Sequence, residues 1–378
     1  MTIEFKKSEG VTLGIEAEIQ LVHRDTLALM NNSTDIIDSL SGLDSSVKHE
    51  LLMSNLEINT CICSSVAEAE RDLREKFAVV SKAAEAYDTL LCCAGTHPFS
   101  RWRDQVVTED ERYMRLMERL KIITRRFNIF GLHVHVGLEG GEKCIYVMNR
   151  MLFYLPHLLA LSANSPFWQG DDTGLKSYRV KVFENLPVAG LPFYFDDWAD
   201  FSRLIDNYKA TGTIETIREI WWDIRPHPDF GTVEIRVCDM PGTIKETLAI
   251  AALIQALVKK FGDEYERGVP FERPHSAITR ENKWRAARYG LDGEFLTEDG
   301  GSTVPVREAI GALLGSVEEE AATLGSAGYL SALGEILAGG TGADRQLRVF
   351  KEGGDLKGVV RDMTDGLLAE TRPADEGE

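Results

Sequence analysis

The chain has 378 residues, 44% of them hydrophobic and 27% charged, a balance that lets it bury a sizeable core without disulfides or a structural metal. Its formal net charge of −18 argues against nucleic acid and against an anionic membrane surface as partners, because both attract basic patches. The charge does not exclude a phosphate substrate, since divalent cations bridge acidic side chains to phosphate oxygens.

Hydrophobic periodicity divides the chain into strand and helix segments. Period-two patterns predict strands, in chain order, at 13–21, 56–61, 91–95, 129–138, 219–224 and 232–238. Helical periodicity predicts helices at 67–90, 110–126, 142–164, 197–209 and 244–261, and further helices within 277–289, 306–322 and 345–371. Loops are expected at 165–174 and 186–196. No GxxxxGK[ST] or GxGxxG turn is present, so any bound ATP is held by another route.

The six cysteines form no CxxC pair, and the first ten residues, MTIEFKKSEG, lack the apolar core of a signal sequence. We therefore expect reduced thiols and a cytoplasmic location. The longest uncharged stretch, 151–170, contains Pro156, His157 and Pro166. It predicts a buried helix that runs into a loop, and not a membrane span.

Four predicted strands have one apolar face and one face of Glu, His or Arg, because side chains alternate faces along a strand. Their polar faces carry Glu16, Glu18 and Gln20; Glu57 and Asn59; His133 and His135; and Glu234 and Arg236. If these strands are neighbours in one sheet, the carboxylates and imidazoles converge into a cluster that repels itself unless cations occupy it. Mostly oxygen ligands with few imidazoles suit Mg²⁺ or Mn²⁺ better than Zn²⁺.

Each motif taken alone has a plainer explanation. An ExE pair is typical of a solvated strand face, ExR of an ion pair on one face, and Glu50 of an exposed residue ahead of a strand. The HxH pair at 133–135 also occurs in metal-dependent hydrolases, but those need further His or Asp ligands, and the remaining histidines show no such arrangement. The joint pattern over four strands favours a metal-centred active site.

The same segments resemble a known family. GIEAE (14–18), LEINT (56–60), GLHVHVG (131–137) and GTVEIRVCD (231–239) are similar to motifs of the carboxylate–amine ligases related to glutamate–cysteine ligase, the type 2 group, which share a catalytic fold with glutamine synthetase. The resemblance covers about residues 13–289 and is supported by GTHP (95–98), SANSPFW (162–168) and WWDIRPHP (221–228).

This resemblance implies an α+β fold. A curved, mainly antiparallel sheet would form an active-site funnel, with helices packed on its outer face, as in glutamine synthetase. Residues 1–378 would make a single catalytic domain, with its core at about 11–290 and a C-terminal helical segment at about 303–371.

The resemblance also implies roles for single residues. The ligands of one metal ion would be Glu18, His133 and Glu234, and those of a second would be Glu16, Glu57 and, seven residues before Glu57, Glu50. The nucleotide phosphates would be contacted by His135 and Arg225, and the transferring γ-phosphoryl group would be stabilised by Arg236.

The substrate pocket is implied by the same motifs. Asn164 and Ser165 would line the acid or nucleotide pocket, His97 would lie at its rim, and 165–174 would form a lid. The plainer alternatives are that Asn164 caps a helix end and that His97 is satisfied within a turn. Cys238 shares the face of Arg236 by strict alternation, but ligase chemistry requires no nucleophilic cysteine.

Taken together, these features imply an ATP-dependent carboxylate–amine ligase that acts through an acyl phosphate, with two or more Mg²⁺ ions, or Mn²⁺, as cofactors. By the resemblance, the acid is L-glutamate through its side-chain carboxylate, and the amine is L-cysteine, as in glutathione biosynthesis. A homo-oligomer is compatible with the sequence. The alternatives are a metal-dependent hydrolase that uses the HxH pair and a non-catalytic nucleotide-binding relative.

Overall fold

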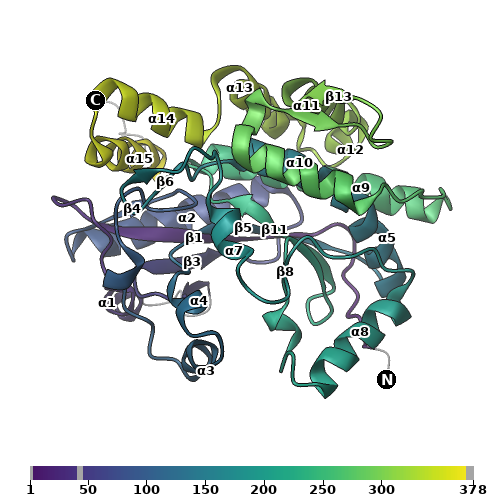
Figure 1. The fold of residues 1–378 in the computed structure, drawn as a ribbon, viewed down its shortest axis with the longest axis horizontal. Coiled ribbons are helices and arrows are strands. Elements are labelled where there is room, and N and C mark those ends of the chain that lie inside the picture. The colour runs from purple at the N-terminus through teal and green to yellow at the C-terminus, as the bar shows by residue number, and fades with distance from the viewer. Residues whose placement is uncertain (1–2, 41–45, 372–378) are drawn as a thin grey trace.

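A seven-stranded sheet runs through the centre of the computed structural model, which describes residues 3–40 and 46–371 (Figure 1). Its strands are β1 (Leu13–His23), β2 (Val47–His49), β3 (Asn55–Asn59), β4 (Thr89–Cys92), β5 (Gly131–Gly137), β10 (Ile224–His227) and β11 (Thr232–Asp239). Their order is β10-β11-β5-β1-β3-β2, and β4 pairs with the end of β1. These pairings are antiparallel, so the predicted α+β class with a mainly antiparallel sheet is confirmed.

Strand β1 lies between β3 and β5 and brings their polar faces together. Its register places Glu16 opposite His133 and Glu18 opposite Glu57. Because side chains alternate faces, the other face of the same strand is apolar. The buried residues on that face are Leu13, Ile15, Ala17, Ile19 and Leu21.

Strand β11 contains a β-bulge between Ile235 and Cys238, where its register against β5 shifts. The extra residue reverses the alternation beyond Arg236. Cys238 therefore lies in the core, with its Sγ 4.0 Å from the carbonyl oxygen of Leu158, and burial raises its pKa to about 12. The expectation that Cys238 shares the face of Arg236 is wrong, because strict alternation does not allow for the bulge.

Most of the apolar face of the sheet is covered by α2 (Val66–Glu85), α5 (Gly141–Met151), α6 (Leu155–Ser162) and α9 (Ile244–Glu266). Helix α9 is rich in Ala, Leu and Ile and is buried along most of its length. It begins at Thr243, whose side chain accepts a hydrogen bond from the main-chain N–H of Glu246. Figure 1 shows α9, α10, α11 and α13 on one side of the sheet and α3, α4 and α8 on the other.

The single helix predicted at 142–164 is broken in the structure. Residues Leu152–Tyr154 form a 3₁₀ turn between α5 and α6, and Pro156 occupies the first turn of α6, where its missing N–H costs nothing. The segment Gly141–Ser162 has the length and apolar composition of a membrane span, but 83% of its most apolar window is buried inside the protein. This burial is typical of a core helix.

The remaining elements surround this core. The further helices are α1 (Ser33–Ser39), α3 (Glu111–Leu120), α4 (Ile122–Arg125), α7 (Arg179–Phe183), α8 (Trp198–Ala210), α10 (Ser276–Tyr289), α11 (Val306–Gly315), α12 (Glu318–Thr323), α13 (Ala327–Gly339), α14 (Gly342–Gly353) and α15 (Leu356–Thr371). The short strand pairs are β6 (Phe167–Trp168) with β7 (Asp171–Asp172), β8 (Ala189–Gly190) with β9 (Trp221–Trp222), and β12 (Glu294–Leu296) with β13 (Thr303–Pro305). Of these, α1, α7, α13 and the β12–β13 pair were not expected from the sequence, and β6, β7 and β8 lie in segments that were expected to be loops.

Truncating the core of α9 should destabilise the protein without touching the polar face of the sheet. Leu253 is fully buried on this helix, so Leu253→Ala should lower the free energy of unfolding by about 2–5 kcal/mol through lost burial and a cavity. Urea denaturation measures this change. On the same helix, the partly exposed Lys259 offers a control, and Lys259→Ala should cost less than about 1 kcal/mol. Equal losses in the two variants would contradict the assignment of α9 as the central core helix.

Candidate active site

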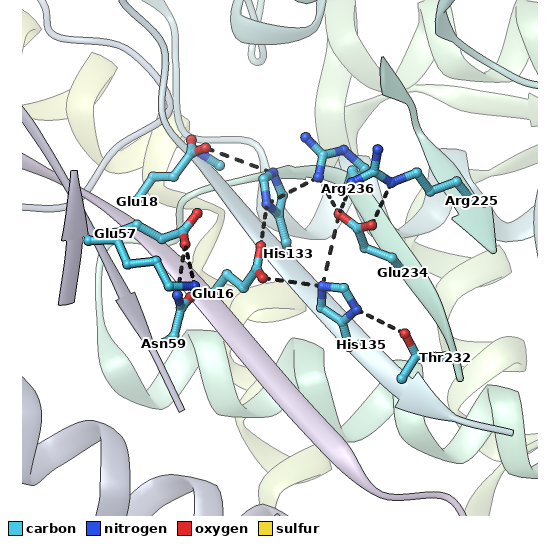
Figure 2. Close-up of polar contacts among 12 residues, drawn as sticks. Glu16, Glu18, Glu57, Asn59, His133, His135, Arg225, Thr232, Glu234 and Arg236 are labelled. Atoms are coloured by element: carbon cyan, nitrogen blue, oxygen red, sulfur yellow. Dashed lines mark hydrogen bonds and ion pairs between the residues drawn. The ribbon is translucent and has the colours of Figure 1, made fainter. Parts of the chain in front are cut away.

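A cavity of about 850 Å³ lies over the polar face of β1, β3, β5 and β11. The predicted site residues that line it are Glu16, Glu18, Glu50, Glu57, His133, His135, Arg225, Glu234 and Arg236. Helix α3, residues 215–221 and Phe230 form other parts of its wall. Figure 2 shows that the labelled side chains extend from adjacent strands toward one another. The convergence expected from strand alternation is therefore present in the structure.

Three carboxyl groups, those of Glu18, Glu50 and Glu57, lie together in the cavity wall; Glu57 is buried, and Glu18 and Glu50 are partly buried. Asn59 donates a hydrogen bond of 2.7 Å to Glu57, and Lys48 Nζ lies 3.7 Å from the same carboxylate. Burial raises the pKa of Glu18 to about 7 and also raises the pKa of Glu57. Burial and the charges of Glu57 and Glu18 raise the pKa of Glu50 well above its ordinary value. Three ionised carboxylates would repel one another here, and a bound cation relieves that repulsion.

The two histidines of β5 lie on either side of Glu16. Nδ1 of His133 is 3.2 Å from one Glu16 oxygen, and Nε2 of His135 is 3.4 Å from the other (Figure 2). Nδ1 of His135 is 3.0 Å from the Thr232 hydroxyl. Burial and the charge of Arg236 lower the pKa of His133 to about 4, which keeps its imidazole neutral and able to bind a cation. Burial opposes ionisation of Glu16, but the charge of His135 and the hydrogen bonds to both histidines together outweigh it and hold the pKa well below its usual value.

Two arginines hold Glu234. Arg225 binds both of its carboxylate oxygens, through Nε at 2.6 Å and Nη2 at 3.3 Å, and its Nη1 donates to the carbonyl oxygens of Ile217 and Ile220. Arg236 Nη1 also donates to Glu234. The charges of Arg225 and Arg236 outweigh burial and hold the pKa of Glu234 well below its usual range. Glu234 is therefore ionised at neutral pH, and both guanidinium groups are fixed in orientation.

In the cavity, two groups of possible ligand atoms are compact enough to hold a cation, with the atoms of each group within 4.8 Å of one another. One group comes from Glu16, His133 and Glu234, and the other from Glu18, Glu57 and His133. The expected grouping placed Glu18 with Glu234 and Glu16 with Glu57. The structure groups them differently, because Glu18 faces Glu57 across β1–β3 while Glu16 faces His133 across β1–β5. Two carboxylates with one imidazole form a donor set that fits Mg²⁺ or Mn²⁺.

Asn164 and Ser165 do not line the cavity. The Asn164 side chain donates to the Met240 carbonyl oxygen at 2.9 Å and accepts from Gln346 Nε2 at 2.7 Å. The Ser165 hydroxyl donates to Asp239 at 2.7 Å. Both side chains are buried, and these bonds fix the segment after α6 to the end of β11. The expectation that they line the acid or nucleotide pocket is therefore wrong.

His97 and the segment 165–174 also lie away from the cavity. His97 is fully buried, with Nε2 2.9 Å from the Leu27 carbonyl oxygen and Nδ1 accepting the Ser100 N–H at 3.0 Å. It is thus the satisfied turn histidine of the plainer alternative. The segment 165–174 forms the β6–β7 pair and contributes no residue to the cavity wall, so the expected lid is wrong. The element that does border the cavity is α3.

Other residues that line the cavity were not expected from the sequence. They include Arg179 on α7 and Tyr113 on α3, whose hydroxyl donates to the His49 carbonyl oxygen at 3.1 Å. His227 and Phe230 also line it, with their rings stacked at a centroid distance of 4.0 Å. Only His227 lies in a motif that the sequence singles out. The others come from segments distant in sequence, whose position depends on the tertiary fold.

Comparison with known proteins gives consistent matches. The sequence profile of glutamate-cysteine ligase family 2 matches residues 12–364. A Gloeobacter violaceus protein, provisionally named glutamate–cysteine ligase 2, is 45% identical over 370 residues, which are 97% of this chain and 100% of that protein. A Thermobifida fusca protein with the same provisional name is 43% identical over 377 residues, which are 98% of this chain and 94% of that protein.

Solved structures match across nearly the whole chain. The glutamate–cysteine ligase of Francisella tularensis, solved in complex with AMP, has a TM-score of 0.74 at 15% identity and covers 98% of this chain and 91% of its own. A bifunctional glutathione synthetase from Pasteurella multocida has a TM-score of 0.72 at 13% identity and covers 96% of this chain and 52% of its own. At these identities the likeness is one of fold.

His97 should make the stability of the protein depend on pH. Burial lowers its pKa from 6.5 to about 3, so between these values the unfolded chain binds a proton that the folded chain does not. The free energy of unfolding should therefore fall as the pH drops below about 6.5. In His97→Asn the side-chain oxygen replaces Nδ1 as acceptor without taking up a proton, which should make this dependence shallower by up to about 1.4 kcal/mol per pH unit. Urea denaturation of both proteins between about pH 7 and 5 measures the two slopes, and equal slopes would refute the expectation.

Proposed function

Because the chain belongs to glutamate-cysteine ligase family 2, we propose that it is an ATP-dependent ligase that joins the side-chain carboxylate of L-glutamate to an amine, with L-cysteine as the expected amine. The observation that carries this proposal is the convergence on one cavity of two carboxylate–imidazole groups and two arginines fixed on Glu234. Phosphoryl transfer needs such a combination, since it is accelerated by positioning and charge neutralisation.

The proposed metal sites use the two ligand sets. One site would take Glu16 and Glu234 and the other Glu18 and Glu57, with Glu50 beside it, and His133 would complete one of the two, because a neutral imidazole offers a single nitrogen lone pair. The raised pKa values of Glu18, Glu50 and Glu57 support this assignment, because a divalent cation stabilises their charged forms. Bound Mg²⁺ would neutralise the phosphate oxygens of ATP.

The arginines differ in how far they are free to contact ATP. Four of the five N–H groups of Arg225 donate to protein groups, so we propose that it positions Glu234; one N–H on Nη2 is left for the expected phosphate contact. Arg236 leaves Nε without a hydrogen-bond partner, and we propose that its planar guanidinium stabilises the transferring γ-phosphoryl group. Burial opposes protonation of His135, but the charges of Glu234 and Glu16 and the hydrogen bond to Glu16 together outweigh it and raise the pKa, which suits a phosphate contact.

The proposed reaction has two steps. A carboxylate oxygen of the acid attacks the γ-phosphorus of ATP, the bond to the ADP oxygen breaks, and an acyl phosphate forms. The amine then attacks the acyl carbon, phosphate leaves with the bonding electrons, and the amine loses a proton to give the amide. The charged histidine and arginine partners of Glu16 and Glu234 keep both carboxylates ionised. These two negative charges are therefore in place before substrate binds.

We infer that the C-terminal helices belong to the same catalytic domain. Helix α13 contacts α9, and α15 contacts β4 and α2. Leu333 and Leu367 lie in the same buried cluster as Leu13. The side chain of Glu370 accepts the main-chain N–H of Ile244 at the start of α9. One hydrophobic core thus joins strand β1 of the sheet to the C-terminal helices α13 and α15.

The hydrolase alternative is less well supported by the geometry. Each of the two ligand sets over the sheet contains two carboxylates and a single histidine, His133. His135 is directed at Glu16 and Thr232 and is absent from both sets. In the described part of the chain, the HxH pair therefore does not act as a two-histidine chelate of the kind that metallohydrolases use.

ADP release should require an acid and an amine together. With Mg²⁺ and ATP, adding L-glutamate and an amine from a panel that includes L-cysteine should raise ADP release at least about tenfold over either alone. Arg236→Lys keeps the charge but loses the planar fork, and should lower the rate on the order of 10³-fold. Amide cleavage without nucleotide would support the hydrolase instead, and ATP binding without turnover would support a non-catalytic relative.

A divalent cation should stabilise the folded protein through the carboxylates of the site. The proposed site exists only in the folded state, so saturating Mn²⁺ should raise the free energy of unfolding by roughly 1–2 kcal/mol. The Tm of the wild-type protein should then rise by several degrees. Glu57→Gln removes one ligand and one charge from a mutually repelling cluster. Its Tm without metal should be unchanged or higher, and its Mn²⁺ affinity should fall about tenfold or more. The exposed Glu335 provides a control, Glu335→Gln, that keeps the full response. A full response in Glu57→Gln would exclude Glu57 as a ligand.

A further inference from the structure

Arg179 is a buried cation in the cavity wall that the chemistry above does not use. It is the first residue of α7, a short helix that packs against β11 (Figure 1), and only 2% of its surface is exposed. A Cβ atom at position 131 would collide with its guanidinium, so Gly131 leaves the space that the guanidinium occupies at the start of β5. Its guanidinium carbon lies 5.5 Å from the ring centroid of Phe183. The local structure is thus built around this side chain.

The guanidinium has few partners. Its Nη1 is 3.4 Å from the Val237 carbonyl oxygen and its Nη2 is 3.3 Å from that of Arg236, while Nε makes no hydrogen bond. In the part of the chain that the structure describes, no carboxylate forms an ion pair with it, whereas Arg225 and Arg236 both pair with Glu234. A guanidinium carries five N–H donors, and burying its charge without an anion is costly. Arg179 therefore has unused capacity to bind an anion.

Three carboxylates interact with this charge from a distance, and each has another partner; Asp223 accepts a hydrogen bond of 2.6 Å from Lys283. Asp239 accepts hydrogen bonds from the hydroxyls of Ser165 and Ser177 at 2.7 and 2.8 Å. Glu18 accepts the N–H of Gly131 and belongs to one of the two proposed metal sites. The donors of the guanidinium consequently remain available to a ligand that enters the cavity.

The position of Arg179 relative to the phosphoryl-handling residues indicates which anion this is. Along β5, Gly131 adjoins Arg179, His133 adjoins Arg236, and His135 is opposite Glu234. Arg179 therefore lies beyond Arg236, on the side away from Glu234. Two residues of a strand span about 6.6 Å, and the carboxyl carbons of an extended five-carbon diacid, four bonds apart, are about 5 Å from each other. An acid activated beside Arg236 can thus reach Arg179 with its second carboxylate.

We propose that Arg179 binds the carboxylate of the acid substrate that is not phosphorylated, and thereby selects a dicarboxylic acid over a monocarboxylic one. The interaction is a charge-assisted pair between a planar guanidinium and a carboxylate, geometrically matched for two parallel hydrogen bonds. This inference rests on the proposed ligase function and adds to it the residue that recognises the acid.

The test compares L-glutamate with 4-aminobutyrate, which keeps the reacting carboxylate and lacks the second one. In wild-type enzyme, kcat/KM for L-glutamate should exceed that for 4-aminobutyrate by at least about 20-fold. In Arg179→Met this ratio should collapse toward one, because only L-glutamate loses an interaction. KM for L-glutamate should rise at least about 20-fold in Arg179→Met and less in Arg179→Lys, while KM for ATP should change less than about threefold.

Control variants separate this role from structural ones. Arg203→Met, on the exposed face of α8, should leave all parameters unchanged, and circular dichroism with Tm should confirm that each variant is folded. If Arg179→Met does not fold, Arg179→Lys provides the same comparison. A raised KM for ATP would overturn the proposal and indicate that Arg179 contacts phosphate. An equal loss of kcat/KM with both acids would overturn it and indicate that Arg179 is a counter-ion to Glu18.

A measurement without turnover distinguishes failure of this inference from failure of the ligase proposal. If no acid–amine pair supports ADP release in the wild-type enzyme, the ligase proposal fails. L-Glutamate should then still raise the Tm of wild-type protein in the presence of Mn²⁺ and should not raise that of Arg179→Met. Equal shifts in the two proteins would show that Arg179 does not bind the acid.

Discussion

The pairing of β1 with β3 on one side and β5 on the other is the constraint on which the rest of the structure depends. It fixes which carboxylate faces which imidazole, and it does so while the opposite face of the same strands is sealed by α2, α6 and α9. A slip of one residue would send every carboxylate into the core and every apolar side chain into the cavity. The hydrophobic core is thus the element that enforces the geometry of the polar face, and the two faces cannot vary independently.

The cavity carries two kinds of buried charge, which are stabilised differently. Glu16 and Glu234 are compensated by histidine and arginine within the protein, so they are ionised before any ligand binds. Glu18, Glu50 and Glu57 lack sufficient compensation, and their charge depends on what enters the site. The arginine-bound half is therefore rigid and preorganised, whereas the carboxylate half gains stability from its ligand. This division matches a site in which a fixed frame orients phosphate and a ligand-dependent part holds cations.

The alternation of polar and apolar residues in the sequence was sufficient to predict which side chains share a face of a strand. The polar faces of β1, β3, β5 and β11, and so the carboxylates, histidines and Arg236 that these strands supply to the cavity, followed from period two. Features that depend on register or on distant contacts could not follow from it. The grouping of Glu18 with Glu57 requires the pairing of β1 with β3, the burial of Asn164 requires Gln346 from the C-terminal segment, and Arg179 reaches the cavity only because α7 packs on β11.

The bulge in β11 changes which positions of that strand belong to the cavity. Before it, even-numbered residues such as Glu234 and Arg236 face the cavity; after it, Cys238 lies in the core and Asp239 takes the polar side. Even-numbered residues of β11 therefore face the cavity before the bulge and the core after it. A sequence comparison that assumed strict alternation would assign residues from Val237 onward to the wrong face. The extra residue is also what lets one continuous strand supply both an arginine of the cavity and the anchor, Asp239, that holds the segment after α6. In evolutionary terms, the bulge lets selection on the cavity residues and selection on the structural anchor act separately. In an unbroken strand, both would be tied to the same alternation of faces.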